Sequence, residues 1–299
     1  MAGNLNKTKR RIASIKSTKK ITKAMEMVAS VKLKRFRDAF ENGKPYIAEM
    51  KEQMAYLCQL EAEEVAAAQL EGKNEPHLSH YQQENADAQG ILYLLITSDL
   101  GLCAGYNSNL FRYLEENFDK EHDTLAPIGN KGLTHYQREE GYTLDTSFAE
   151  LGLSVDPRDI HRCGEKIKKE FNEGKYKKVV LIYTHYRNSI SFIPEMETIL
   201  PLSLEPSEKE YRSHAPELLK EEPNALLHAL LPSYLAGAIT YRMVESQLCE
   251  QASRRTAMEN ANDNADELLR TLTIEYNKAR QTAITQEIVE VVSGSANAN

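Results

Sequence analysis

Two long stretches of helical periodicity, one at each end of this 299-residue chain, constrain its fold most strongly. From about residue 5 to 60, apolar side chains return at spacings of three, four or multiples of seven residues, which predicts one long helix. From about residue 223 to 292, a near-heptad stripe predicts a second helix. The stripe consists of Ala261, Ala265, Leu268, Leu272, Ala279 and Ala283. At about 1.5 Å per residue the helices would be roughly 80 Å and 90 to 100 Å long, and helices of such length need a partner.

Because the two helices bracket the chain, we expect them to pair antiparallel, with the chain ends together and the middle as a separate lobe. The alternative, two surface helices of an ordinary domain, is disfavoured by their length and periodicity. A bend or break of the first helix is expected at Gly43 and Pro45, and a stop of the second at Ser293-Gly294-Ser295. The predicted divisions are an N-terminal coiled-coil helix (1–60), a polar linker (61–89), a central α/β lobe (90–204), an acidic linker (205–222) and a C-terminal coiled-coil helix (223–299).

The central segment alternates β-rich runs with helical ones. The runs Ile91 to Thr97 and Lys178 to Thr184 are typical of buried parallel strands. Further strands are expected at 125–128, 143–148 and 192–200, and helices at 107–118, 131–139 and 157–171. This alternation predicts an open, Rossmann-like α/β sheet covered by helices. The expected fold class is therefore α/β plus a long helical coiled coil of antiparallel N- and C-terminal helices.

Charge is polarised along the chain, although the net charge is only −7. Basic residues dominate the first helix from Lys7 to Arg37, and Glu26 is the only acid before Asp38. Such a face can be a solvated surface, a contact for an acidic protein or a grip on nucleic acid. A nucleic-acid-binding coiled coil would need a basic second helix as well, and that helix carries Glu259, Asp263 and further acids. We therefore expect no nucleic-acid partner.

Cysteine and histidine positions give no sign of a metal or a disulfide framework. The four cysteines lack paired spacing, and the eight histidines lack metal-ligand spacing. We expect no metal, no cofactor and a reducing compartment. No apolar run approaches the roughly 20 residues of a membrane span, and the first residues lack the apolar core of a secretory signal. Membrane association is therefore expected only through partner proteins.

The turn from Ser98 to Gly105 is the strongest candidate for a ligand site, because phosphates often bind between a strand and a helix. Its glycines, Gly101 and Gly105, are separated by three residues, which matches neither a dinucleotide fingerprint nor a phosphate loop. Cys103 lies in the turn without a histidine nearby in sequence to activate it. We interpret the turn as structural and expect no catalytic residue. The alternative function, a nucleotide-binding α/β enzyme with a coiled-coil arm, would need the missing phosphate loop.

Three motifs carry a resemblance to a known family. Residues 11–29 (RIASIKSTKKITKAMEMVA) resemble the N-terminal signature of F-type ATP synthase γ subunits. Residues 260–265 (NANDNA) and 276–288 (YNKARQTAITQEI) look like the C-terminal signature, and 98–107 (SDLGLCAGYN) is similar to the internal one. The chain departs from the family in having Leu100 where Arg is usual and Ala104 where Gly is usual.

The resemblance implies a central rotor shaft that is not itself an enzyme. A left-handed antiparallel coiled coil would insert into the α3β3 hexamer of F1, with the lobe on the c-ring of Fo beside the ε subunit. The shaft would couple ion-driven rotation of the ring to ATP synthesis or hydrolysis at the β subunits. The implied location is peripheral, on the cytoplasmic face of the bacterial plasma membrane.

The resemblance also implies contacts between rotor and stator. One is at Met25, and others are at Arg280, Gln281 and Thr285, of which the last two share a helix face because they are four residues apart. The alternatives are that Met25 only packs in the seam between the helices, and that Arg280 and Gln281 are ordinary solvated side chains.

Overall fold

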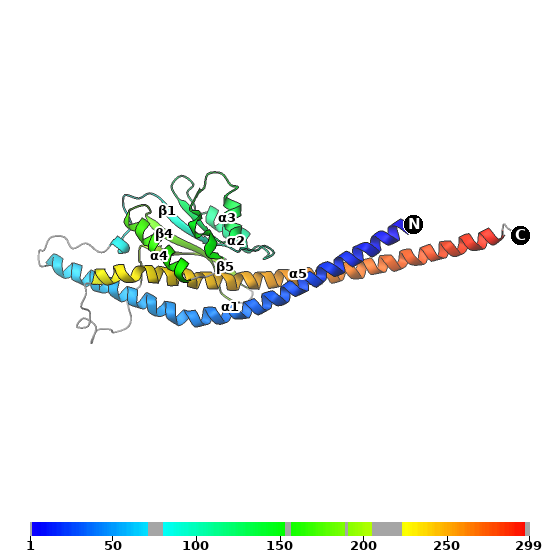
Figure 1. Ribbon diagram of the computed structural model, residues 1–299, viewed down its shortest axis with the longest axis horizontal. Coiled ribbons are helices and arrows are strands. Elements are labelled where there is room, and N and C mark those ends of the chain that lie inside the picture. Colours follow the sequence, from blue (N-terminus) through cyan, green and yellow to red (C-terminus); the bar gives the residue numbers. More distant parts are fainter. Residues whose placement is uncertain (1, 71–79, 153–156, 189–190, 205–222, 297–299) are drawn as a thin grey trace. The chain divides into compact units, whose positions relative to one another are not determined.

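The computed structural model of the chain describes residues 2–70, 80–152, 157–188, 191–204 and 223–296. They divide into two compact units: a terminal helix unit, Met1–Val31 with Ser253–Asn299, and a sheet unit, Lys32–Ala252. Two long helices, α1 (Ala2–Leu70) and α5 (Pro223–Ala296), contribute to both units. They are blue and yellow to red in Figure 1. The expected fold class, an α/β lobe with long N- and C-terminal helices that pack together, is confirmed.

The sheet unit contains a five-stranded sheet with strand order β3-β2-β1-β4-β5. Its strands are β1 (Ile91–Ile96), β2 (Thr124–Ile128), β3 (Thr143–Leu144), β4 (Lys178–Tyr186) and β5 (Phe192–Leu200). The first four are parallel, whereas β5 pairs antiparallel with β4 and forms an edge of the sheet. The connecting helices are α2 (Tyr106–Glu115), α3 (Asn130–Tyr136) and α4 (Pro157–Asn172).

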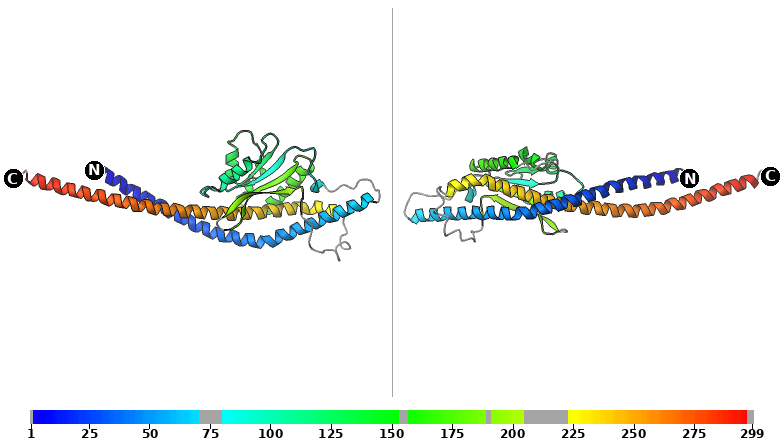
Figure 2. Two further views of the ribbon diagram at one scale, coloured as in Figure 1. Left: turned by 180° about the vertical axis from the view of Figure 1, so that it is seen from behind. Right: turned by 60° about the horizontal axis from the view of Figure 1, so that its bottom comes forward.

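Both faces of the sheet are buried, as the apolar run of β1 predicts. Leu92, Leu94 and Ile96 point to one face and pack in a cluster with residues of α4 and α5. Tyr93 and Leu95 point to the other face and pack with residues of α2 and α3. Figure 2 shows the sheet from two further directions, with α1 and α5 running past it side by side. The sheet is therefore held directly on the long helices.

The first helix differs from its prediction at two places. It continues past the predicted end at residue 60 to Leu70, so the expectation of a polar linker over 61–89 is wrong for 61–70. That stretch is rich in Ala and Glu, which favour helix. The helix is also continuous through Gly43 and Pro45, so the expected break does not occur, and the alternative of a bend there stays a prediction. A Cβ on Gly43 would lie 3.3 Å from Tyr241 Cδ2, so this part of α1 packs closely on α5, and such packing overrides weak local propensity.

Two further boundaries were predicted wrongly. The strand expected over 143–148 ends at Leu144, because the Asp145 carboxylate accepts hydrogen bonds from the backbone N–H and hydroxyl of Ser147 and starts the 3-10 helix Thr146–Gly152. The helix α5 does not stop at Ser293-Gly294-Ser295 but runs to Ala296. The other predicted elements begin and end within a few residues of the observed ones. The predicted acidic linker 205–222 lies outside the described residues.

Candidate functional site

The terminal helix unit is built on a heptad seam between α1 and α5. Along α1 most of the buried and half-buried positions of this unit follow alternating spacings of three and four residues: Leu5, Thr8, Ile12, Ile15, Lys19, Thr22, Glu26 and Ala29. The matching stripe on α5 is Met258, Asn262, Ala265, Leu269, Leu272 and Tyr276. The predicted stripe is confirmed at Ala265 and Leu272 but wrong at Leu268, which is 47% exposed, and at Ala279, which is exposed.

A polar network crosses this seam. The hydroxyl of Thr22 donates to Asn262 Oδ1 at 2.5 Å, and Asn262 Nδ2 donates to Glu26 Oε2 at 2.6 Å. Lys23 Nζ donates to Glu26 Oε1 at 2.9 Å, and Lys19 pairs with Asp266. The hydrogen bond from Lys23 lowers the pKa of Glu26, as does the one from Asn262. A polar group in a coiled-coil seam fixes which residues face one another, so the network sets the register of the pair.

Many apolar side chains of the terminal helix unit point to solvent. Those on α1 are Ile21, Met27, Val28 and Val31, and those on α5 are Leu268, Ile274, Ile284, Ile288, Val289 and Val291. Val31 and Val291 are more than 70% exposed. Scattered apolar residues are normal on a surface, whereas large exposed apolar patches are typical of surfaces that bind another protein.

Met25 is half-buried and lies beside the seam, between the seam positions Thr22 and Glu26. Arg280, Gln281 and Thr285 are all exposed on α5. The Thr285 hydroxyl donates to the Gln281 carbonyl oxygen at 2.9 Å, so these two share a face. Because the helices are antiparallel, Met25 lies near Asn262 and several helical turns from Arg280. The predicted site residues therefore lie at two separate places on one unit.

Sequence reasoning missed Glu26 and Asn262. Asn262 follows Met258 by four residues and precedes Ala265 by three, so a heptad that included residue 262 in place of 261 would have revealed it. It also missed the exposed apolar positions, because a single helix does not show which side its partner covers.

The crevice at the carboxyl ends of β1 and β4 is where open α/β sheets bind ligands, since the connection after β1 runs to one side of the sheet and the connection after β4 runs to the other. Here α5 fills it. The Ser246 hydroxyl accepts a hydrogen bond from the backbone N–H of Thr184 at 3.3 Å, and Cys249 Sγ donates to the Thr184 carbonyl oxygen at 3.5 Å. A space of only about 20 Å³ remains among Thr97, Asp99, Tyr106, Ser246 and neighbouring residues. A nucleotide does not fit in such a volume.

The turn after β1 is closed by its own side chains. Asn107 Nδ2 donates to the Ser98 hydroxyl at 2.7 Å, and its Oδ1 accepts from the Ser98 backbone N–H at 3.1 Å. The Asp99 carboxylate accepts from the backbone N–H of Asn130 at 2.9 Å at the start of α3. Leu102 and Ala104 have left-handed φ angles of 63° and 48°. These contacts support the interpretation of a structural turn.

Three of the four cysteines have surroundings that disfavour the reactive thiolate. Burial raises the pKa of the Cys58 thiol to about 12 and that of Cys163 to about 11, and it raises the pKa of Cys249 further. Among the described residues, no three His, Cys, Asp or Glu side chains are grouped so that they could hold a metal ion. Within the same ranges, no helix is both long and apolar enough to cross a membrane.

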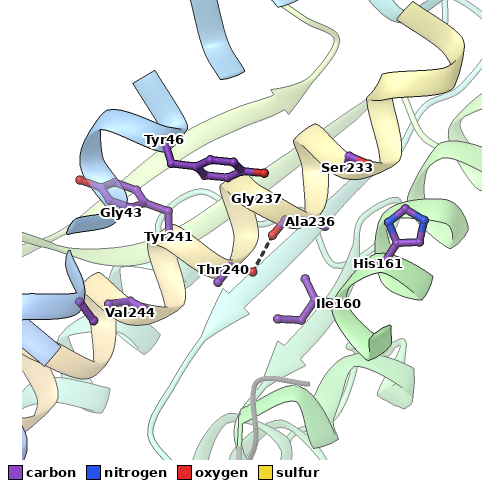
Figure 3. Close-up of a pocket in the computed structure, with 11 residues that line it drawn as sticks. Gly43, Tyr46, Ile160, His161, Ser233, Ala236, Gly237, Thr240, Tyr241 and Val244 are labelled. Atoms are coloured by element: carbon purple, nitrogen blue, oxygen red, sulfur yellow. Dashed lines mark hydrogen bonds between the residues drawn. The ribbon is translucent and has the colours of Figure 1, made fainter. Parts of the chain in front are cut away.

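A hollow of about 390 Å³ lies between α1, α4 and α5 in the sheet unit. Figure 3 shows the Tyr46 ring lying over α5 near Gly237, with His161 and Ile160 on α4. The Thr240 hydroxyl donates to the Ala236 carbonyl oxygen at 2.7 Å. A Cβ on Gly237 would lie 3.5 Å from Tyr46 Cε1, so the missing side chain of Gly237 contributes to the hollow.

Comparison with known proteins gives concordant matches over nearly the whole chain. The family model described as ATP synthase matches residues 4–298. The chain is 34% identical to the sodium-ion-specific ATP synthase gamma chain of Acetobacterium woodii over 99% of both chains. It is 32% identical to the ATP synthase gamma chain of Chlorobium phaeobacteroides over 95% of both.

Solved structures share the fold. A chain in the OSCP/F1/c-ring structure of the Euglena gracilis mitochondrial ATP synthase aligns with a TM-score of 0.64 and 16% identity, over 99% of this chain and 95% of that one. A chain in the rotor structure of the same enzyme aligns with a TM-score of 0.58 and 18% identity, over 95% of this chain and all of that one.

Proposed function

This chain belongs to the gamma chain family of ATP synthases, and we propose that its paired terminal helices act as a central rotor shaft. The shaft couples ion-driven rotation of a membrane ring to ATP synthesis or hydrolysis on other subunits. The observation that carries the proposal is the construction of the terminal helix unit. Its seam is held in register by a polar network, and many apolar side chains around the seam are exposed. A rotating element needs a stiff interior and an outer surface that another protein can enclose.

The exposed apolar residues suit a bearing. An apolar surface inside a protein sleeve loses little free energy as it turns, because dispersion contacts have no fixed direction. Polar residues on the same surface make directional hydrogen bonds that favour particular angles. Ile284 and Ile288 continue the exposed surface beside Gln281 and Thr285, so one part of α5 offers both kinds of contact.

The proposed partners are the α3β3 hexamer of F1 around the helices, and the ε subunit with the c-ring of Fo at the lobe. The E. gracilis structures contain F1, c-ring and rotor components, which supports this assignment. The bacterial relatives support a location on the cytoplasmic face of the plasma membrane, reached through Fo. The chain itself is proposed to be non-catalytic, with the nucleotide sites on α and β, because α5 fills the sheet crevice that the enzyme alternative requires.

Each β subunit of the hexamer meets a different face of an asymmetric helix pair. Rotation then changes the relative free energies of the open and closed states of each β subunit in turn. Arg280 can form a charge-assisted hydrogen bond with a β carboxylate, and Gln281 can donate and accept hydrogen bonds. These residues form the proposed catch, and Met25 is the proposed bearing contact.

The catch is tested with Arg280→Ala combined with Gln281→Ala in a reconstituted α3β3γ complex. We expect normal assembly with slower ATP turnover and altered rotational dwell times, because the contact biases β conformations without building the nucleotide site. Lys278→Ala, another exposed cation on the same helix, is the control and should turn over normally. Normal dwell times in the double variant would remove both residues from the mechanism.

Met25→Lys tests the bearing. If Met25 touches the sleeve, the variant keeps ATP hydrolysis but loses ion pumping, because a charge is forced against an apolar surface. If Met25 only packs in the seam, the isolated chain loses helical stability in a thermal melt instead. Met25→Leu conserves volume and adds no charge, so it should leave both readouts unchanged. Unchanged pumping and melting in Met25→Lys would contradict both roles.

A further inference from the structure

A single arginine joins α5 to both strands at one edge of the sheet. The Arg242 guanidinium lies 4.3 Å from the ring centroid of Tyr183 on β4. Its Nε donates to Glu197 Oε2 on β5 at 2.5 Å, and a terminal nitrogen donates to Glu245 Oε2 on α5 at 2.7 Å. The Arg242 side chain is only 16% exposed. Stacking and forked hydrogen bonds together fix the position of the guanidinium in three directions.

Glu245 provides a second connection between α5 and β4. Its side chain is fully buried, and its Oε1 accepts a hydrogen bond from the backbone N–H of Tyr186 at 3.0 Å. The Nδ1 of His185 lies 2.7 Å from the same oxygen. On the other side of Arg242, Lys51 of α1 pairs with Glu197. This α5–sheet charge cluster, Lys51, His185, Glu197, Arg242 and Glu245, therefore connects α1, β4, β5 and α5.

The charges are surrounded by an apolar layer that could have held the sheet on the helices without them. Leu235, Ile239 and Met243 of α5 are buried against the sheet core within a few residues of Arg242. Buried ion pairs seldom stabilise a fold more than apolar side chains of the same volume, because desolvation of the ions offsets their attraction. Apolar layers also allow small sliding motions. Directional hydrogen bonds and ion pairs, in contrast, allow only one orientation of the sheet relative to α5.

We propose that the α5–sheet charge cluster is a torsional lock that fixes the rotational setting of the sheet on the α1–α5 pair. The proposal rests on the shaft function given above, because torque applied to the sheet reaches the helices through this contact. Arg242 is the central positioning residue of the lock. Without it, the sheet turns about the helix pair by small angles, and each rotary step has to take up this internal twist before it moves the helices.

The lock itself is tested in the full-length chain by pulsed electron spin distance measurements between labels at Glu139, after α3, and Lys34, on α1. Both positions are exposed and belong to the sheet unit. The neutral variant combines Glu197→Gln, Arg242→Met and Glu245→Gln, which keeps a carbonyl acceptor for Tyr186. We expect the distance distribution to become about twofold wider than in the wild type. The control, Asp145→Asn with Lys166→Met, removes another ion pair of the sheet unit that does not join sheet to α5 and should leave the width unchanged.

A width equal to the wild type would overturn the lock. If the neutral variant does not fold, Arg242→Lys is measured in its place, since Lys keeps the charge but loses the forked hydrogen bonds and the stacking on Tyr183. This variant should give a distance distribution of intermediate width. A distribution as narrow as that of the wild type would again overturn the proposal. In the reconstituted holoenzyme, the neutral variant should hydrolyse ATP normally but show an about twofold wider spread of rotational dwell angles. A widened distance distribution with an unchanged spread of dwell angles would leave the lock in place and count against the shaft function, so the two failures are distinguishable.

Discussion

At the scale of single residues, the turn after β1 contains backbone strain that the sequence alone does not predict. Leu102 and Ala104 adopt φ angles of 63° and 48°, a region that costs an L-residue roughly 1–2 kcal/mol. The γ subunits that this chain resembles usually have Gly where it has Ala104. The sequence shows the alanine at this position, but it does not show the conformational strain. That strain depends on the backbone angle, which follows from the hydrogen bonds between Ser98 and Asn107.

Ala104→Gly should therefore raise the free energy of unfolding of the sheet unit by about 1 kcal/mol, because glycine reaches this φ without steric strain. Urea unfolding followed by tyrosine near-ultraviolet circular dichroism measures the change. Ala39→Gly, at an exposed position of the regular helix α1 in the same unit, is the matched control and should lower stability by about 1 kcal/mol. A loss of stability in both variants would contradict the assigned backbone strain.

Glu197 gives a prediction for acid. Burial alone raises its pKa, but the hydrogen bond and charge of Arg242, together with Lys51, bring the pKa below its usual value of 4.5. A lowered folded-state pKa means that this stabilisation is complete above pH 4.5 and is lost as the pH falls through the folded value. Urea midpoints measured from pH 7 to pH 3 should fall below about pH 4.5, and Glu197→Gln should make that fall shallower. Glu139→Gln, at an exposed position, should leave the slope unchanged; an equally steep fall in Glu197→Gln would contradict the assignment.

At the scale of elements, the sequence predicts the long helices and their antiparallel pairing, but it places one stripe wrongly. Leu268 and Leu269 are adjacent, and a single helix gives no reason to choose between them. The packing against α1 decides between them, and Leu269 is the one that is half-buried in the seam. The same limit applies to the strand expected over 143–148, which ends because the Asp145 carboxylate captures the backbone of Ser147. It applies to the site as well: the motifs point to Met25, but only the pairing puts Met25 beside the seam.

Leu269→Ala should lower the melting stability of the terminal helix unit by about 1–2 kcal/mol, because a half-buried seam side chain is lost. Leu268→Ala should change it by less than about 0.5 kcal/mol, because that side chain is nearly half exposed. Thermal unfolding followed by circular dichroism at the helix band compares the two. Equal losses, or a larger loss for Leu268→Ala, would mean that the register of the seam is wrong.

At the scale of the whole molecule, the two units differ in which of their surfaces are buried and which are exposed. In the sheet unit, α5 is attached to the sheet at the crevice where ligands usually bind. Ser246 and Cys249 of α5 occupy the place where a Rossmann-like sheet usually holds a nucleotide. The terminal helix unit leaves many of its apolar residues exposed. A subunit of this kind is expected to act through its neighbours.

The isolated chain should consequently bind no ATP at micromolar concentrations. Calorimetric titration of the full-length chain with Mg²⁺ and ATP should show only heats of dilution, because the remaining space of about 20 Å³ in the crevice admits no nucleotide. Ser246→Gly, which opens the crevice slightly, should give the same result. A stoichiometric, Mg²⁺-dependent binding isotherm would contradict the shaft function and favour the enzyme alternative.

The seam contact between Thr22 and Asn262 joins residues that are 240 positions apart in the chain. A ribosome that adds about 5–20 residues per second leaves roughly 12–48 s between the two. During this time the strands of the sheet are complete, while the first turns of α1 have no partner. The terminal helix unit is therefore the last part of the chain that can form. The dense lysines and arginines of α1 have a second use in that interval, because like charges keep the waiting segment from associating with other nascent chains.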